Sequence, residues 1–185
     1  VCQPARSTNP LRQGGGCYNE SLMIYLTASR ISAHDGLTVE AWIYLTGETS
    51  EQYIVTKNLE YSLRARGDNQ FIHFDIWNGA SWYYTYTGAV LTLNSWQHVV
   101  GVLDNSDDVK IYLNGVEQSV SHNNEYASPV NKGEDVHIGH ITGSSSYFNG
   151  LIDEVRIYNR ALSENEIKQS YTGYDSSIQL TVNVE

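Results

Sequence analysis

The residues best suited to ligand chemistry lie in one stretch, residues 71–88 (FIHFDIWNGASWYYTYTG), where seven of eighteen side chains are aromatic. Asn78-Gly79 lies within it and is a strong two-residue hairpin signal between alternating runs. Because side chains alternate across a strand, only one face of each arm can join a core. The other face combines flat rings with polar groups, which suits stacking on sugar rings and hydrogen bonding to their hydroxyls. We therefore predict a carbohydrate-binding site that comprises His73, Asp75, Trp77, Trp82 and Tyr84.

A second interpretation of this aromatic face stays open. A long loop, such as residues 119–135, could cover the same side chains and turn them into a second small core. Exposed aromatic patches usually mark interaction sites, so we give binding and burial equal weight.

Catalytic motifs are poorly represented in the chain. Glycoside hydrolases need paired acids that point into one cleft, and no Glu-x-Asp pattern occurs. A polysaccharide lyase would use clustered Arg, His and Tyr side chains, which Arg64, His73 and Tyr84 could supply. Neither a nucleophile elbow nor an HExxH motif is present. We interpret the protein as non-catalytic and keep a polysaccharide-degrading enzyme as a minor alternative.

Three other polar candidates have structural interpretations. Glu40, in the apolar run VEAWI, is predicted to be a buried carboxylate that is hydrogen-bonded across a sheet to the strand of His98. His137 and His140 are three residues apart, which would send them to opposite faces of a strand rather than to one metal. Residues 66–68 spell Arg-Gly-Asp, but Gly-Asp is expected at the turn predicted there.

Length and charge restrict the function classes. A chain of 185 residues fits one domain, and its net charge of −10 argues against nucleic acid and anionic membranes as partners. No apolar stretch is long enough to span a bilayer, so we expect no membrane insertion.

The N-terminal arm, residues 1–20, carries features of export. The spacing of Cys2 and Cys17 fits neither a zinc site nor a redox CxxC motif, and we expect a disulfide that closes the arm. Asn19 begins an N-glycosylation sequon. We therefore predict an extracellular protein, secreted or at the cell surface.

The elements that must position these residues are short and alternating, and turn signals of Gly, Asn and Asp separate them. Many short strands at this spacing predict an all-β fold, an antiparallel two-sheet β-sandwich or jelly roll. The expected strands are 22–28, 37–45, 52–56, 60–66, 70–77, 82–87, 96–103, 109–114, 136–139 and 150–158.

One short helix is predicted near the C-terminus, over residues 164–171. Ser163 can cap its first turn while Glu166 returns the hydrogen bond, and Leu162 with Ile167 forms a hydrophobic staple. We expect the helix to pack on the sandwich through Ile167 and Tyr171.

Three segments carry a family resemblance: GLTVEAWIYL (36–45), SWQHVVGVLDNSDDVKIYLNGVEQ (95–118) and FNGLIDEVRIYNRALSENEI (148–167). In order and spacing they resemble the laminin-G-like jelly-roll family of the concanavalin A-like superfamily. The resemblance implies two curved sheets and an extracellular sugar-binding or adhesive module. We accordingly divide the chain into the arm 1–20, a laminin-G-like domain 21–172 and an additional C-terminal strand 173–185.

The resemblance also implies one possible cofactor, a structural calcium ion. Asp153 follows the Asn149-Gly150 turn in a motif where the acid of family members often helps to hold an ion, and Asn19 and Glu20 could approach it. The loop 140–147 contains no acid, which argues against a double calcium site there.

The tail predicts an alternative function. Residues 178–184 alternate between apolar and polar side chains, which is a strand pattern. This strand could close its own sheet or pair with the exposed edge of a neighbouring subunit. In the second case the protein would be a structural subunit of an extracellular filament, surface layer or adhesin that self-assembles through its C-terminal strand.

Overall fold

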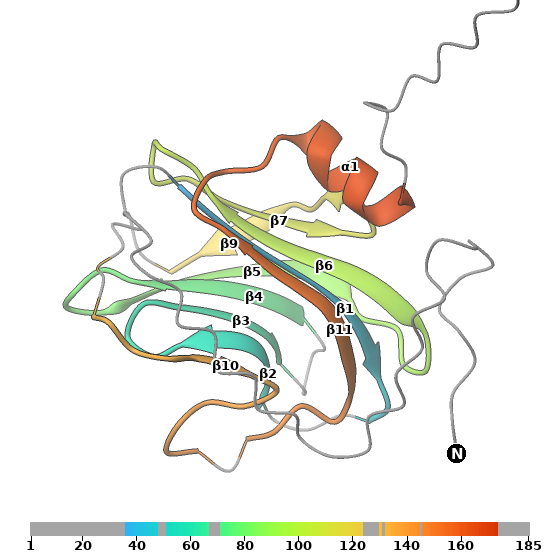
Figure 1. Ribbon diagram of the computed structural model, residues 1–185, viewed down its shortest axis with the longest axis horizontal. Coiled ribbons are helices and arrows are strands. Elements are labelled where there is room, and N and C mark those ends of the chain that lie inside the picture. The colour runs from blue at the N-terminus through green and yellow to red at the C-terminus, as the bar shows by residue number, and fades with distance from the viewer. Residues whose placement is uncertain are drawn as a thin grey trace, which may run out of the picture.

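Two antiparallel sheets pack face to face in the computed structural model, and one short helix lies against the outside of one of them (Figure 1). The structure describes residues 36–47, 51–66, 71–123, 130, 132–144 and 146–173. Within these residues, no helix has the length and apolar character needed to cross a membrane.

The five-stranded sheet has the order β11-β1-β6-β7-β8 and the six-stranded sheet has the order β10-β2-β3-β4-β5-β9. The first comprises β1 (Leu37–Leu45), β6 (Trp96–Leu103), β7 (Val109–Leu113), β8 (Val116–Glu117) and β11 (Gly150–Tyr158). The second comprises β2 (Glu51–Lys57), β3 (Tyr61–Arg66), β4 (Phe71–Trp77), β5 (Trp82–Val90), β9 (Val120–His122) and β10 (Val136–Ile138). This confirms the predicted all-β sandwich. The short strands β8 and β9 were not predicted, and the expected strand 22–28 lies outside the described residues.

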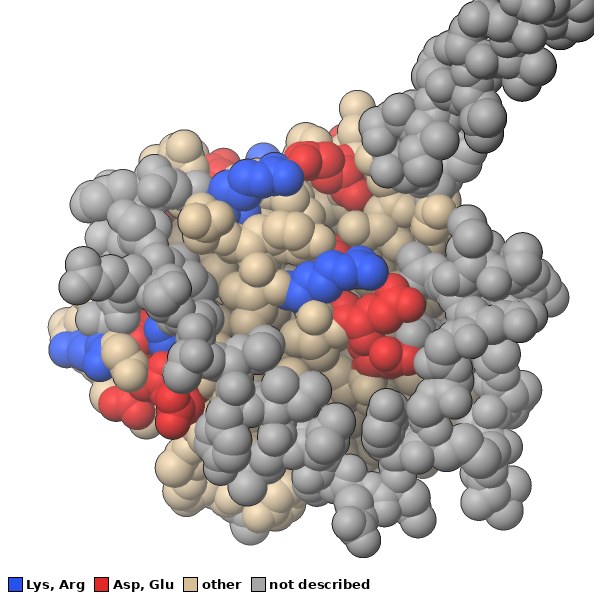
Figure 2. All heavy atoms as spheres, viewed as in Figure 1, with Lys and Arg blue, Asp and Glu red and all other residues tan. Residues whose placement is uncertain are grey.

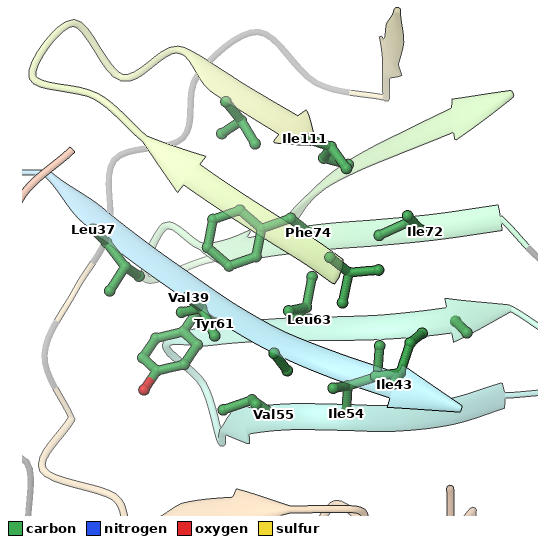
Figure 3. Packing of buried hydrophobic residues seen from close by; sticks show 14 of the residues in the cluster. Leu37, Val39, Ile43, Ile54, Val55, Tyr61, Leu63, Ile72, Phe74 and Ile111 are labelled. Carbon is green, nitrogen blue, oxygen red and sulfur yellow. The ribbon is translucent and has the colours of Figure 1, made fainter. Parts of the chain in front are cut away.

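The main core fills the space between the sheets. Side chains of β1 point toward those of β2, β3 and β4 (Figure 3). Ile72, Phe74 and Ile76, which alternate along β4 on the face toward the other sheet, are completely buried. Gly101 on β6 makes room for the Phe74 ring, because a Cβ on Gly101 would lie 2.2 Å from that ring. The apolar face of β4 is therefore fixed against the opposite sheet.

The predicted helix is present as α1 (Glu164–Thr172). Ser163 accepts a hydrogen bond from the backbone of Glu166, and the Glu166 side chain accepts one from the Ser163 backbone, so the capping box is confirmed. Ile167 is fully buried in a second, smaller apolar cluster on the outside of the five-stranded sheet. Tyr171 stacks on Trp42 at 5.7 Å between ring centres, as the packing prediction requires.

Glu40 connects β1 to its neighbours beneath this helix. Its carboxylate accepts hydrogen bonds from His98 at 3.1 Å and from Arg156 and Tyr158 at 3.0 Å each. Ser170 of α1 donates at 3.4 Å. Glu40 is 0% exposed, so the predicted role as a buried, hydrogen-bonded carboxylate is confirmed.

The hairpin between β4 and β5 differs from the two-residue turn that Asn78-Gly79 suggested. Trp77 pairs with Trp82, so the loop has four residues. The Asn78 side chain accepts hydrogen bonds from the backbone of Ala80 at 3.0 Å and of Ser81 at 2.8 Å. This side-chain turn replaces the tight backbone turn.

Charged side chains on the face drawn in Figure 2 mix in sign, because blue and red atoms lie beside each other. Two ion pairs of described residues have this character, Arg156 with Glu154 at 3.2 Å and Arg160 with Glu166 at 2.7 Å. Because each pair joins a cation to an acid, neither makes the potential of this surface mainly positive or mainly negative.

Candidate functional site

The five residues predicted to bind carbohydrate share the outer face of the six-stranded sheet. Asp75 of β4 lies opposite Tyr84 of β5, and Trp77 lies opposite Trp82. Directly opposite residues in an antiparallel pair point to the same side. His73 precedes Asp75 by two positions and therefore shares this side. We call this surface the aromatic face.

Neighbouring strands extend the aromatic face with residues outside the predicted set. Arg64 of β3 lies opposite His73, and Tyr86 of β5 lies opposite His73 on the other side. Glu51 and Tyr53 of β2 reach the same surface, where Tyr53 lies opposite Arg64. Once the pairing of β3 with β4 is known, the alternation in YSLRAR (61–66) places Arg64 on this face. The sequence of β2 gives no comparable indication for Glu51 or Tyr53.

Exposure divides the aromatic face into two layers. Tyr84 and Tyr86 are 36% and 37% exposed, whereas His73 and Asp75 are only 4% and 1% exposed. Trp77 and Trp82 are half-buried. The polar residues thus form a buried layer and the tyrosines an exposed one. Part of this face is therefore buried, while its two tyrosines stay exposed; whether it binds a ligand remains a prediction.

An ion-pair network holds the buried layer together. The Nε atom of Arg64 donates to Oδ2 of Asp75 at 2.7 Å, and its NH1 donates to Oε1 of Glu51 at 2.6 Å. The Tyr53 hydroxyl donates to the second oxygen of Glu51 at 2.9 Å. Arg64 is 6% exposed, so its charge is neutralised inside the protein rather than offered to solvent.

The network shifts the pKa of its members. Burial alone would raise the pKa of Glu51, but the charge of Arg64 and the hydrogen bond from Tyr53 lower it below its ordinary value. Burial and the hydrogen bond to Glu51 raise the pKa of Tyr53 to about 12. Glu51 is therefore ionised and Tyr53 protonated at neutral pH.

Aromatic contacts hold the exposed rings against this layer. The guanidinium carbon of Arg64 lies 5.7 Å from the centre of the Tyr84 ring and 6.0 Å from that of Tyr53. His73 stacks on Tyr86 at 5.3 Å. The two exposed tyrosines are thus held by buried charged and aromatic partners.

Several buried polar atoms of the aromatic face have no hydrogen-bond partner among the described residues. They are Ser62 Oγ, His73 Nδ1, Asp75 Oδ1 and Trp77 Nε1. His73 Nδ1 and Asp75 Oδ1 are 3.7 Å apart, too far for a direct hydrogen bond. Unpartnered buried polar atoms are uncommon and need an explanation such as a water or a ligand. Here they lie beside the exposed tyrosines.

Both ends of the loop that could cover the aromatic face are anchored at its border. Asn123 accepts a hydrogen bond from the Tyr84 backbone at 2.7 Å. Val130 donates to the Trp77 carbonyl at 3.3 Å. Residues 124–129 between these anchors lie outside the described part of the chain.

His137 and His140 are close together, which corrects the prediction that they face opposite sides. Their ring centres are 4.8 Å apart. β10 ends at Ile138, and Gly139 has a φ of 81°, so strand alternation does not continue to His140. His137 bonds to Thr142 and His140 stacks on Tyr147. Burial together with the charge of His140 lowers the pKa of His137.

The candidate calcium ligand lies on the other sheet. Asp153 is opposite Trp42, and its Oδ1 accepts a hydrogen bond from the Glu154 backbone at 2.7 Å. The described residues contain no group of three His, Cys, Asp or Glu side chains that could hold a metal. Asp153 would need ligands from Asn19 and Glu20, which lie outside these residues. Cys2, Cys17, residues 67–68 and the tail 174–185 also lie outside them.

Two antiparallel sheets around one core, with an aromatic and polar outer surface, define a lectin-like β-sandwich. The family model of the laminin-G type, described as the concanavalin A-like lectin/glucanases superfamily, matches residues 20–168. The chain belongs to this superfamily. A comparison with curated protein sequences finds no match.

Solved structures share the fold. A Bacteroides ovatus ATCC 8483 protein for which carbohydrate binding has been suggested gives a TM-score of 0.64 at 22% identity, and the match covers 83% of this chain but only 44% of that one. The CBM40 domain of the Ruminococcus gnavus IT-sialidase, bound to α2,3-sialyllactose, gives 0.65 at 17% identity, with 82% and 92% covered. Domain 4 of AbnA, a GH43 extracellular arabinanase from Geobacillus stearothermophilus, in complex with arabinotriose, gives 0.62 at 19% identity, with 81% of each chain covered. At these identities the likeness shows the fold alone.

Proposed function

We propose that this protein is a non-catalytic, extracellular recognition module that binds a glycan on the aromatic face. The observation that carries the proposal is the exposed pair Tyr84 and Tyr86, held above a buried polar layer in which several atoms have no hydrogen-bond partner among the described residues. Exposed, contiguous aromatic side chains on a rigid sheet are typical of an interaction surface. Export is part of the proposal because of the paired cysteines and the sequon in the N-terminal arm.

The tyrosines supply the main apolar contact in this proposal. They are two positions apart on β5, which corresponds to about 7 Å along a strand. A ligand that contacts both rings must therefore extend beyond one monosaccharide. Trp82 lies two residues before Tyr84 on the same face and continues the row. We expect oligosaccharides to bind more tightly than single sugars.

The buried layer fixes the orientation of the rings and offers polar partners. Arg64 lies against Tyr84 and His73 against Tyr86, so each exposed ring has a fixed neighbour beneath it. A sugar hydroxyl that enters between His73 Nδ1 and Asp75 Oδ1 would satisfy both atoms, and bridging of this kind is as favourable as a water-mediated bond. Because Tyr86 stacks on His73 at 5.3 Å, this ring would have to move for a hydroxyl to reach the two atoms.

The contacts of three acids, Asp75, Glu51 and Glu40, support a non-catalytic role. Asp75 and Glu51 both form ion pairs with Arg64. The Glu40 carboxylate, under the helix, accepts hydrogen bonds from four donors. The arrangement that a lyase would use is present, because Arg64 and His73 are paired across strands and Tyr84 lies beside Arg64. However, two carboxylates already neutralise the charge of Arg64, so it offers no excess positive charge to the acid group of a uronate substrate.

The structural relatives add support of a coarser kind. The CBM40 domain and AbnA domain 4 were each solved with a saccharide, and both share this fold. Each belongs to a larger enzyme whose own activity is no guide to this chain. The likeness therefore supports glycan binding as a class and leaves the ligand to be inferred from the aromatic face.

A glycan array with three forms of the protein tests the proposal. The parent should bind a subset of oligosaccharides with dissociation constants on the order of 10 μM to 1 mM, since two stacked rings bury little area. The double variant Tyr84→Ala/Tyr86→Ala should lose these signals. Tyr147→Ala removes a tyrosine that is more exposed, at 56%, and that pairs with His140 just after β10, the strand at the other edge of the sheet, and this variant should keep them. Equal binding by all three folded forms would refute the proposed site.

A further inference from the structure

We infer that the aromatic face selects neutral oligosaccharides and rejects sialylated and uronic-acid glycans. This inference rests on the proposed function and adds the chemical class of the ligand. It runs against the simplest expectation from the fold, because the CBM40 relative was solved with α2,3-sialyllactose, which is anionic.

The positive charge of Arg64 is already neutralised within the protein. Its Nε lies 2.7 Å from a carboxylate oxygen of Asp75 and its NH1 lies 2.6 Å from one of Glu51, so two negative charges already surround this single positive charge. It is 6% exposed, and Tyr53 and Tyr84 flank it. To pair with Arg64, an anionic sugar would have to compete with the buried Asp75 or with the half-exposed Glu51, and displacing Asp75 would leave a buried carboxylate without its partner.

Positive and negative side chains balance each other on the aromatic face. Arg66 is opposite Glu51 in the strand register, and it has a partner of its own. Two arginines therefore face two acids, Glu51 and Asp75, and β5 (WYYTYTGAV) contributes no charge. Among the residues that the structure describes, the aromatic face carries no excess positive charge, and the whole chain has a net charge of −10.

The borders of the aromatic face do not change this balance. Lys57 is buried and pairs with Glu60 at 2.8 Å. Lys132, whose backbone donates to the Glu60 side chain, is followed by Glu134 and Asp135, which are exposed like Lys132 itself. A carboxylate on the ligand would thus meet paired cations and additional acids, and like charges brought together without compensation disfavour binding.

The buried polar atoms without a partner among the described residues also suit neutral ligands. Asp75 Oδ1 is an acceptor only, so its natural partner is a hydroxyl donor and not a second carboxylate. Ser62 Oγ can donate or accept, and Trp77 Nε1 can donate. Neutral sugar hydroxyls suit all three groups, because each hydroxyl both donates and accepts.

Matched glycan pairs test the inference. An array that presents each neutral oligosaccharide beside its sialylated or uronic counterpart should show binding to neutral members, about tenfold or more tighter than to their anionic partners. Because no net charge is paired, this binding should barely change between low and high salt. The signals should disappear in Tyr84→Ala/Tyr86→Ala.

The failures of the two proposals can be told apart. Anionic members that bind best, with signals lost in the double tyrosine variant, would overturn the neutral selectivity and leave the glycan-binding face intact. Binding to no member of either class would overturn both. Binding that persists in the double variant would place the ligand elsewhere and also overturn both.

A charge variant gives an independent check in the intact protein. Glu51→Gln removes one acid from the aromatic face, so its affinity for the anionic member of a pair should rise by on the order of fivefold relative to the neutral member. Glu164→Gln makes the same change in net charge on the exposed first turn of α1 and should leave the ratio unchanged. An equal ratio in both variants would contradict the inference.

Discussion

The guanidinium carbon of Arg64 lies 5.7 Å from the centre of the Tyr84 ring, so an exposed aromatic side chain rests directly on a buried cation. The same cation bonds Asp75 and Glu51 from the two neighbouring strands. Three strands of the six-stranded sheet are therefore connected at the point where we place the ligand. This connection makes the site and the stability of the sheet interdependent.

The variant Arg64→Met tests this interdependence. It should lower the free energy of unfolding by about 3–5 kcal/mol, because it leaves two carboxylates near each other without their shared cation. Chemical denaturation measures the change. A loss below about 1 kcal/mol, the range of surface ion pairs, would contradict the buried network.

Glu40 should make stability depend on acid pH. Burial alone would raise the pKa of Glu40, but the hydrogen bonds from His98 and Arg156 lower it below the ordinary 4.5. A carboxyl group with a lowered pKa in the folded state stabilises the fold above its unfolded pKa, and this contribution is lost as the pH falls through the folded value. Glu40→Gln should therefore cost about 1–3 kcal/mol at pH 7, and the difference from the parent should shrink below about pH 4.5.

Denaturant titrations of both proteins at several pH values measure this difference. Glu164→Gln serves as the control, since Glu164 lies exposed on the first turn of α1. A difference between parent and Glu40→Gln that stays constant from pH 7 to pH 3 would show that the ionised carboxylate is not what stabilises the fold.

Gly101 should tolerate no side chain. Alanine there would place its Cβ 2.2 Å from the buried Phe74 ring, so either the ring or β6 must shift. We expect a loss of about 1–3 kcal/mol, as for other overpacked cores. Gly88→Ala is the matched control, because its Cβ would meet nothing within 4 Å. Similar melting temperatures for the two variants would refute the tight approach of the sheets.

Calcium binding near Asp153 remains a prediction. If an ion is bound, EDTA should lower the melting temperature of the full chain and added calcium should restore it, since binding to the folded state stabilises that state. Asp153→Asn should abolish the response. A melting curve unaffected by EDTA would remove the metal from the account.

Much of the architecture was predictable from the sequence because alternation and capping are local. The bounds of β1, β6 and β11 agree with the predicted segments, and the capping box of α1 could be recognised from Ser163 and Glu166 alone. Strand alternation also predicted correctly that the five proposed ligand residues share a face. Alternation places the residues within each strand, and the hairpin signal at Asn78-Gly79 brings β4 and β5 together, so both indications are local in the sequence.

The organisation of the site could not be predicted in the same way. Arg64 and Asp75 are eleven residues apart in the sequence, and only the pairing of β3 with β4 brings them together. The burial of Arg64, Asp75 and His73 depends on the side chains that the adjacent strands place around them. The approach of His140 to His137 depends on a positive φ at Gly139, which interrupts the alternation that the prediction assumed.

The most direct test of the central claim is an NMR titration of the isotope-labelled protein with an oligosaccharide that it binds. If the ligand binds the aromatic face, chemical shifts should change there, at Tyr84, Tyr86 and the Arg64 side chain. Signals from the outside of the five-stranded sheet, such as Trp42 and Tyr171, should stay unchanged. Shift changes confined to that opposite sheet, with Tyr84 and Tyr86 unaffected, would contradict the account.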